Sequence, residues 1–240
     1  LIAERPLAQH CPELLRPVPT AGELLPTLAQ LGDRLARALG AGLARLAGSE
    51  APTVQRGEPR ECTMSEVAAG IAPLAANSLM TLDARKAPFL ASVEATAVFR
   101  MVDRPFGGRG QVPEPLPTAF PMSAQLLTGR LETLVATAID EALGPQTDGS
   151  VRALNRDGSL EVLAPFADET QMIALTLDVH ETAPSMTWQL TLAFPVASLT
   201  EILGEAQPAP KPGKRNAANP AEEPFGEVPL SVIALLVDMR

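Results

Sequence analysis

The chain has 240 residues, 19 of them basic and 28 acidic, and its formal net charge is −9. This length suits one domain with an appendage. The acidic surface excludes a protein whose main task is to neutralise nucleic-acid phosphates. No apolar run reaches the roughly 18–20 residues that span a bilayer, and none has the pattern of a signal peptide. Two cysteines, Cys11 and Cys62, are too few for a disulfide framework and fit a reducing cytoplasm.

The chain opens with a proline-rich stretch followed by a leucine-striped helix. Four prolines within residues 1–20 prevent a long helix, so this segment is interpreted as an arm. In residues 24–46, leucine recurs at three- and four-residue steps, which is the spacing of one face of an α-helix. The stripe consists of Leu28, Leu31, Leu35, Leu39, Leu43 and Leu46.

The elements after this helix form a first cycle that ends in a glycine-rich turn. A short strand, a helical turn, a pair of strands and a helix are predicted at residues 53–58, 65–71, 77–84 with 87–93, and 94–103. Arg85 and Lys86 form the tight connection between the paired strands. The glycines of residues 107–110 and a proline-rich run then follow.

A second cycle repeats this order. Ser123 is expected to cap a helix that ends at Gly144, and strands with strict alternation follow at residues 173–179 and 186–194. A short helix begins at Pro195. Asp83 and Asp178 follow comparable leucines and are interpreted as turn-forming residues at strand ends. The repeated order predicts a three-layer α/β/α sandwich with an internal pseudo-two-fold duplication, in which both halves contribute to one sheet.

The composition of the chain changes after residue 205. Residues 21–205 are therefore expected to form the main domain. Residues 206–224 contain five prolines among small and charged residues, which is typical of a linker. In residues 225–240, apolar residues alternate at Val228, Leu230 and Val232, as in a strand. A lone strand is not stable by itself, so this one either completes a sheet of another chain or begins a further domain.

No enzyme signature survives inspection of the chain. His10 and His180 lack a metal-ligand spacing, and the cysteines have no Cys-x-x-Cys partner. Gly108-Arg109-Gly110 begins like a dinucleotide fingerprint but lacks its third glycine, and the prolines that follow prevent the helix that should come next. The sequence therefore predicts no catalytic residue, no metal and no cofactor.

The glycine-rich turn itself has two interpretations. Gly107, Gly108 and Gly110 leave a surface with almost no side chains, from which Phe106 and Arg109 project. A partner's backbone or helix can approach such a surface closely. A loop without function explains the same glycines equally well.

At this turn the chain resembles a known family. Residues 99–110, Phe-Arg-Met-Val-Asp-Arg-Pro-Phe-Gly-Gly-Arg-Gly, resemble the Gly-Gly-x-Gly region of the FliM family of flagellar motor switch proteins. The resemblance implies a CheC-like middle domain that binds FliG and packs against neighbouring FliM copies, at the cytoplasmic face of the basal body and without insertion in the membrane. The implied FliG contact consists of Phe106, Gly107, Gly108, Arg109 and Gly110. Residues 225–240 resemble the entry into a SpoA-type domain, and Val228, Leu230 and Val232 would pair with FliN.

The chain also departs from the family pattern. The segment that captures phosphorylated CheY has no match in residues 1–20, which leaves CheY binding open, and Pro105 replaces a bulky apolar residue. CheC-like phosphatases use a Glu and an Asn three residues later, whereas Glu132 here is followed at that spacing by Val135. Two alternatives remain: a SpoA-type sorting-platform protein of type III secretion, and a CheC-like CheY phosphatase.

Overall fold

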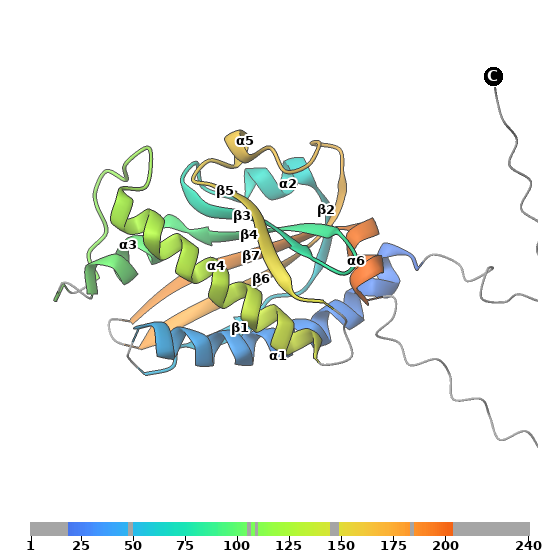
Figure 1. The fold of residues 1–240 in the computed structure, drawn as a ribbon, viewed down its shortest axis with the longest axis horizontal. Helices are drawn as coiled ribbons and strands as arrows, with labels where there is room; N and C mark the ends of the chain where they lie inside the picture. Colours follow the sequence, from blue (N-terminus) through green and yellow to red (C-terminus); the bar gives the residue numbers. More distant parts are fainter. Residues whose placement is uncertain are drawn as a thin grey trace, which may run out of the picture. The chain divides into compact units, whose positions relative to one another are not determined.

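One antiparallel sheet between two layers of helices organises the described part of the chain (Figure 1). The computed structural model describes residues 19–47, 50–104, 107–108, 110–144, 149–182 and 185–203. Its elements, in chain order, are α1 (Ala21–Ala47), β1 (Thr53–Arg56), β2 (Arg60–Thr63), α2 (Met64–Ala69), β3 (Ala75–Leu82), β4 (Ala87–Glu94), α3 (Ala95–Asp103), α4 (Met122–Leu143), β5 (Val151–Asp157), α5 (Leu160–Leu163), β6 (Gln171–Thr182), β7 (Ser185–Pro195) and α6 (Val196–Leu203).

The strand order shows the duplication. The order is β1-β6-β7-β4-β3-β5, with β2 also paired to β6, so that β4 and β7 meet at the centre. The first repeat runs from α1 to α3 and the second from α4 to α6. Each repeat pairs its first strand with the hairpin of the other repeat, since β1 pairs with β6 and β5 pairs with β3. The prediction that one sheet is assembled from both halves is confirmed.

The long helices α1 and α4 lie on one face of the sheet, where most of the core is buried (Figure 1). The leucine stripe of α1 faces this core, as its spacing predicts. Alternate residues of β6 and β7 point into the same core, which confirms the period-two pattern. The buried members of these elements are Leu28, Leu31, Leu35, Leu39, Leu43, Ile173, Leu175, Leu177, Val179, Trp188, Leu190, Leu192 and Phe194.

The short helices α2 and α5 cover the opposite face and complete the three layers (Figure 1). They enclose a smaller apolar cluster, to which the sheet contributes Leu90, Met172, Ala174 and Ala193. Antiparallel sheets commonly have one fully covered face and one that is partly solvated. The thinner second layer therefore fits the sheet type.

Two expectations about local structure are wrong, and one strand was not expected. Strand β2 was not predicted, because Arg60 and Glu61 are charged and its pairing with β6 comes from tertiary structure. Ser123 does not cap α4, which begins at Met122 with Pro121 as its N-cap and no side-chain capping bond. Asp178 does not end a strand, because pairing with β7 extends β6 to Thr182; its carboxylate accepts a hydrogen bond from Gln189 at 2.8 Å.

The predicted linker and the final strand lie within residues 204–240, outside the described residues. Most of the predicted arm, residues 1–18, also lies outside them. These boundaries stay predictions.

Thr63 joins β2 to α2 and should contribute measurably to stability. Its hydroxyl accepts the Glu66 N–H at 3.3 Å, and the Glu66 carboxylate accepts the Thr63 N–H at 2.7 Å, which forms a capping box. We expect Thr63→Ala to lower the free energy of unfolding by about 1 kcal/mol. Urea unfolding measures this loss, and Thr63→Ser, which keeps the hydroxyl, should stay close to wild type. Equal losses in both variants would contradict a capping role.

Candidate functional site at the glycine corner

The end of α3 forms a turn that we name the glycine corner, defined as the described residues Gly107, Gly108, Gly110 and Gln111. The Gly107 N–H donates to the Arg104 carbonyl at 2.9 Å, and the Gly108 N–H donates to the Asp103 carbonyl at 3.1 Å. These are the two bonds of a Schellman motif, which ends a helix with a residue at positive φ. Gly107 supplies that residue, with a φ of +82°.

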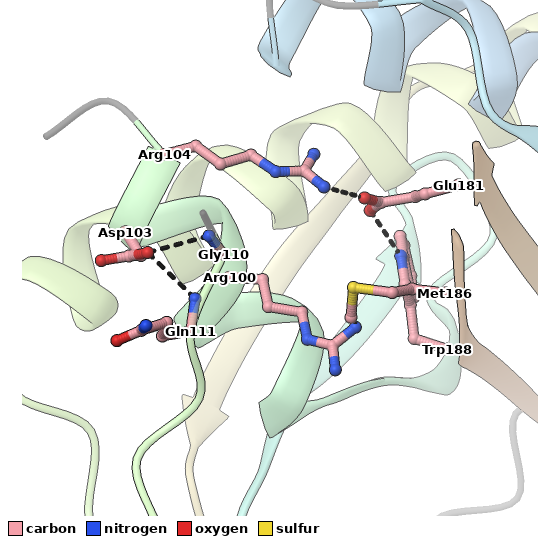
Figure 2. A network of polar contacts seen from close by, with 8 residues as sticks. All are labelled: Arg100, Asp103, Arg104, Gly110, Gln111, Glu181, Met186 and Trp188. Atoms are coloured by element: carbon pink, nitrogen blue, oxygen red, sulfur yellow. Dashed lines mark hydrogen bonds and ion pairs between the residues drawn. The ribbon is translucent and has the colours of Figure 1, made fainter. Parts of the chain in front are cut away.

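Asp103 also binds the corner through its side chain (Figure 2). Its Oδ2 accepts the N–H of Gly110 at 2.8 Å and the N–H of Gln111 at 2.9 Å. A Cβ at Gly108 would lie 2.0 Å from this oxygen, so a side chain there would displace the carboxylate. Gly108 therefore leaves room for Asp103, whereas a Cβ at Gly107 would meet nothing within 4 Å.

Arg104 connects the end of α3 to the β6–β7 hairpin (Figure 2). Its Nη2 pairs with Oε2 of Glu181, and Oε1 of Glu181 accepts the indole N–H of Trp188 at 3.0 Å. The side chains of Arg104 and Glu181 are only 21% and 11% exposed. This ion pair is mostly withdrawn from water, so it fixes the end of α3 to the sheet.

The predicted site residues differ in exposure, and some of them lie outside the described part of the chain. Gly107 and Gly108 are exposed, whereas Gly110 is buried and has a φ of +79°. Phe106 and Arg109 lie outside the described residues, as do the candidate FliN-pairing residues Val228, Leu230 and Val232.

The residues that hold the corner in shape were not singled out in the sequence. They are Asp103, Arg104, Glu181 and Trp188. One available signal was the aspartate just before the glycines, because a carboxylate near several unpaired backbone N–H groups commonly accepts from them. Nothing in the sequence indicates Glu181, which lies 77 residues from Arg104.

Among the described residues, Cys62 is buried and His180 is hydrogen-bonded, so both have structural surroundings. Burial raises the pKa of the Cys62 thiol, with a further rise from Glu66 and an opposing effect of Arg60. Nδ1 of His180 shares a hydrogen bond of 2.9 Å with the Thr187 hydroxyl. Across the described ranges, no group of three or more His, Cys, Asp or Glu side chains is arranged to hold a metal ion.

Among the described residues, Glu132 comes closest to the phosphatase pattern, but its carboxylate already binds other side chains of the domain. Its side chain is 10% exposed, its Oε2 accepts the Ser78 hydroxyl at 3.0 Å, and its Oε1 lies 3.3 Å from Nη2 of Arg156. Val135, at the position of the phosphatase asparagine, is 3% exposed. This pair cannot orient a water molecule for attack on a phosphoryl group.

A groove of about 650 Å³ lies between the start of α4 and the β5–α5 segment. Met122 and Leu126 of α4 and Val162 of α5 are about 70% exposed along it. Its charged lining residues are Arg156 and Asp157. Ser78 lines the groove, but its hydroxyl donates to the Glu132 carboxylate, which also pairs with Arg156 and is only 10% exposed. Among the described lining residues, the exposed surface is therefore mainly apolar.

No model of a known protein family matches the chain, and no curated protein matches it in sequence. Solved structures do match it. The FliM chain of the FliG–FliM complex from H. pylori has a TM-score of 0.70 at 18% identity, covering 78% of this chain and 100% of that one. The FliM middle domain from V. alginolyticus has a TM-score of 0.62 at 15% identity, covering 76% and 98%. Thermotoga maritima FliY has a TM-score of 0.59 at 11% identity, covering 78% and 99%.

The fold is thus a duplicated α/β/α sandwich with a tethered glycine corner at the end of α3. Among solved proteins, it is the fold of the FliM middle domain, as the sequence resemblance implied. At 11–18% identity the likeness establishes the fold. Within the described ranges, no helix is both long enough and apolar enough to cross a membrane.

Proposed function

We propose that the chain is a component of the flagellar motor switch that docks FliG at the glycine corner and performs no covalent chemistry. The observation that carries the proposal is the corner itself, where Gly107 and Gly108 are exposed and, among the described residues, none lies within 4 Å of a Cβ built at Gly107. The fold supports it, since a FliM chain with the same fold has been solved in complex with FliG. A bare backbone surface allows close approach of a partner.

The engaged state of Glu132 supports the choice of a binding role over the CheC-like phosphatase. Its carboxylate is held by Ser78 and Arg156, and the position three residues later is a buried valine. The sorting-platform alternative has the weaker support, because the glycine corner is not expected in those proteins. Flagellar or secretion genes beside the gene for this chain would distinguish the two.

The proposal places the protein at the cytoplasmic face of the flagellar basal body. Further partners are neighbouring copies of the same domain and FliN, the latter through Val228, Leu230 and Val232. Coupling of a chemotaxis signal to rotation would then pass through the glycine corner, while direct CheY binding remains an open part of the proposal.

Gly107→Asp tests the corner as a docking surface. Position 107 has open space for a side chain, and Asp is among the residues that best tolerate positive φ, so the domain should remain folded. The added carboxylate projects into the contact, so we expect FliG binding to weaken at least about tenfold. Isothermal titration with FliG of the same organism measures the affinity.

Gly144 offers a matched control at the C-terminus of α4. It also has positive φ, +81°, and a Cβ there would meet nothing within 4 Å. Its ψ of 175° disfavours side chains strongly, so Gly144→Asp should cost at least as much stability as Gly107→Asp. Normal FliG binding by both variants would refute docking at the corner.

A further inference from the structure

We propose that Asp103 is the positioning residue of the glycine corner and that Gly108 is glycine in order to accommodate it. As a statement about partner docking, this inference rests on the proposed function. Asp103 accepts three backbone N–H groups at 2.8–3.1 Å. The N–H of Gly108 donates to its carbonyl, and those of Gly110 and Gln111 donate to its carboxylate (Figure 2). One residue at the end of α3 therefore determines the path of the chain on the far side of the turn.

The fit between Asp103 and Gly108 is steric as well as polar. A Cβ at Gly108 would lie 2.0 to 2.2 Å from the three outer atoms of the Asp103 carboxylate, well inside van der Waals contact. By contrast, a Cβ at Gly110 would meet only the side chains of Arg100 and Arg104, at an ordinary 3.7 Å. The carboxylate thus excludes a side chain at 108, whereas the positive φ at 110 favours glycine without excluding other residues.

The polar groups that the corner presents outward follow from this arrangement. The N–H groups of Gly107, Gly108, Gly110 and Gln111 all donate within the molecule. Among the described residues, no donor reaches the carbonyl oxygens of Gly107 and Gly108. The exposed backbone consequently offers acceptors, so a complementary partner brings N–H or O–H donors. Because Asp103 holds the corner before contact, the partner does not have to order it.

The first test measures the corner and the affinity separately. In Asp103→Ala, we expect amide exchange of Gly110 and Gln111 to accelerate at least about tenfold and FliG binding to weaken by a similar factor. Asp103→Asn retains an acceptor oxygen and should recover most of both. The melting temperature should change little, because the Asp103 carboxylate is not part of the apolar core. Unchanged amide exchange or unchanged affinity in Asp103→Ala would overturn the proposal.

A double-mutant cycle tests the steric part. Gly108→Ala should weaken FliG binding in the wild-type background, because the new methyl group displaces the carboxylate. In the Asp103→Ala background the obstructing atoms are gone, so the same change should add little further loss. Additive losses in the double variant would show that the two positions act independently.

The two measurements, amide exchange and FliG affinity, distinguish a failure of this inference from a failure of the proposed function. If the wild-type protein fails to bind FliG, the proposed function falls. Amide exchange of Gly110 and Gln111 then decides alone whether Asp103 orders the corner, since that measurement needs no partner.

Discussion

Replacing Glu181 with alanine is expected to lower the free energy of unfolding by about 3–5 kcal/mol, because it leaves a mostly buried cation without its partner. Arg104 is 21% exposed and would lose the carboxylate that neutralises it. The indole N–H of Trp188, a residue only 3% exposed, would also lose its acceptor. An unsatisfied buried donor costs about 1–3 kcal/mol by itself. Both losses act at the point where α3 is joined to the β6–β7 hairpin.

Denaturant unfolding with two companion variants separates the contributions to this effect. Glu181→Gln keeps an acceptor for Trp188 but removes the charge that Arg104 needs, so its loss should be intermediate. Glu181→Leu combined with Arg104→Met removes both charges together and should be less destabilising than Glu181→Ala. A free energy of unfolding within about 1 kcal/mol of wild type for Glu181→Ala would show that water enters the network and solvates Arg104.

Periodicity made most of the fold predictable. The leucine stripe of α1 and the alternation in β6 and β7 each bury one face, and such patterns depend only on the geometry of a single element. The repeated order of elements then indicated a sheet shared between two halves. The same reasoning could not supply β2, whose strand character comes from its pairing with β6.

The contacts that shape the glycine corner could not be predicted from periodicity, because they join residues that the pattern of a single element does not relate. The glycines of the corner were identified from the sequence, but the structural reason why each of the three positions is glycine was not. Gly107 ends a helix, Gly108 makes room for a carboxylate, and Gly110 adopts positive φ while donating to the same carboxylate. The last two reasons depend on where the Asp103 side chain points. Rotamers of this kind are settled by surrounding contacts rather than by residue type.

The shared sheet has a thermodynamic consequence. Within the described part of the chain, four of the six strand pairings join one repeat to the other, namely β1–β6, β2–β6, β3–β5 and β4–β7. Neither repeat therefore completes its own sheet. We infer that the described domain unfolds as one cooperative unit, and that a defect at the central β4–β7 pair affects both halves.

Phe194→Ala should strongly lower the free energy of unfolding through a defect at that centre. Phe194 of β7 and Phe89 of β4 stack with ring centroids 4.9 Å apart, and they are 2% and 1% exposed. Removing a fully buried phenylalanine costs about 3–5 kcal/mol through lost burial and the cavity that remains. The stacked pair adds about 0.5–1.5 kcal/mol beyond its burial, so Phe89→Ala and Phe194→Ala should be non-additive in a double-mutant cycle.

Fluorescence of Trp188, the only tryptophan of the chain, reports the second repeat during this experiment, and far-ultraviolet circular dichroism reports both repeats. The two signals should shift together in Phe194→Ala, because a defect shared by both repeats lowers one common transition. Leu154→Ala is the control: this side chain is 48% exposed on β5 and should change the free energy of unfolding by less than about 0.5 kcal/mol. Separate transitions for the two signals would mean that the repeats unfold independently despite the strands they share.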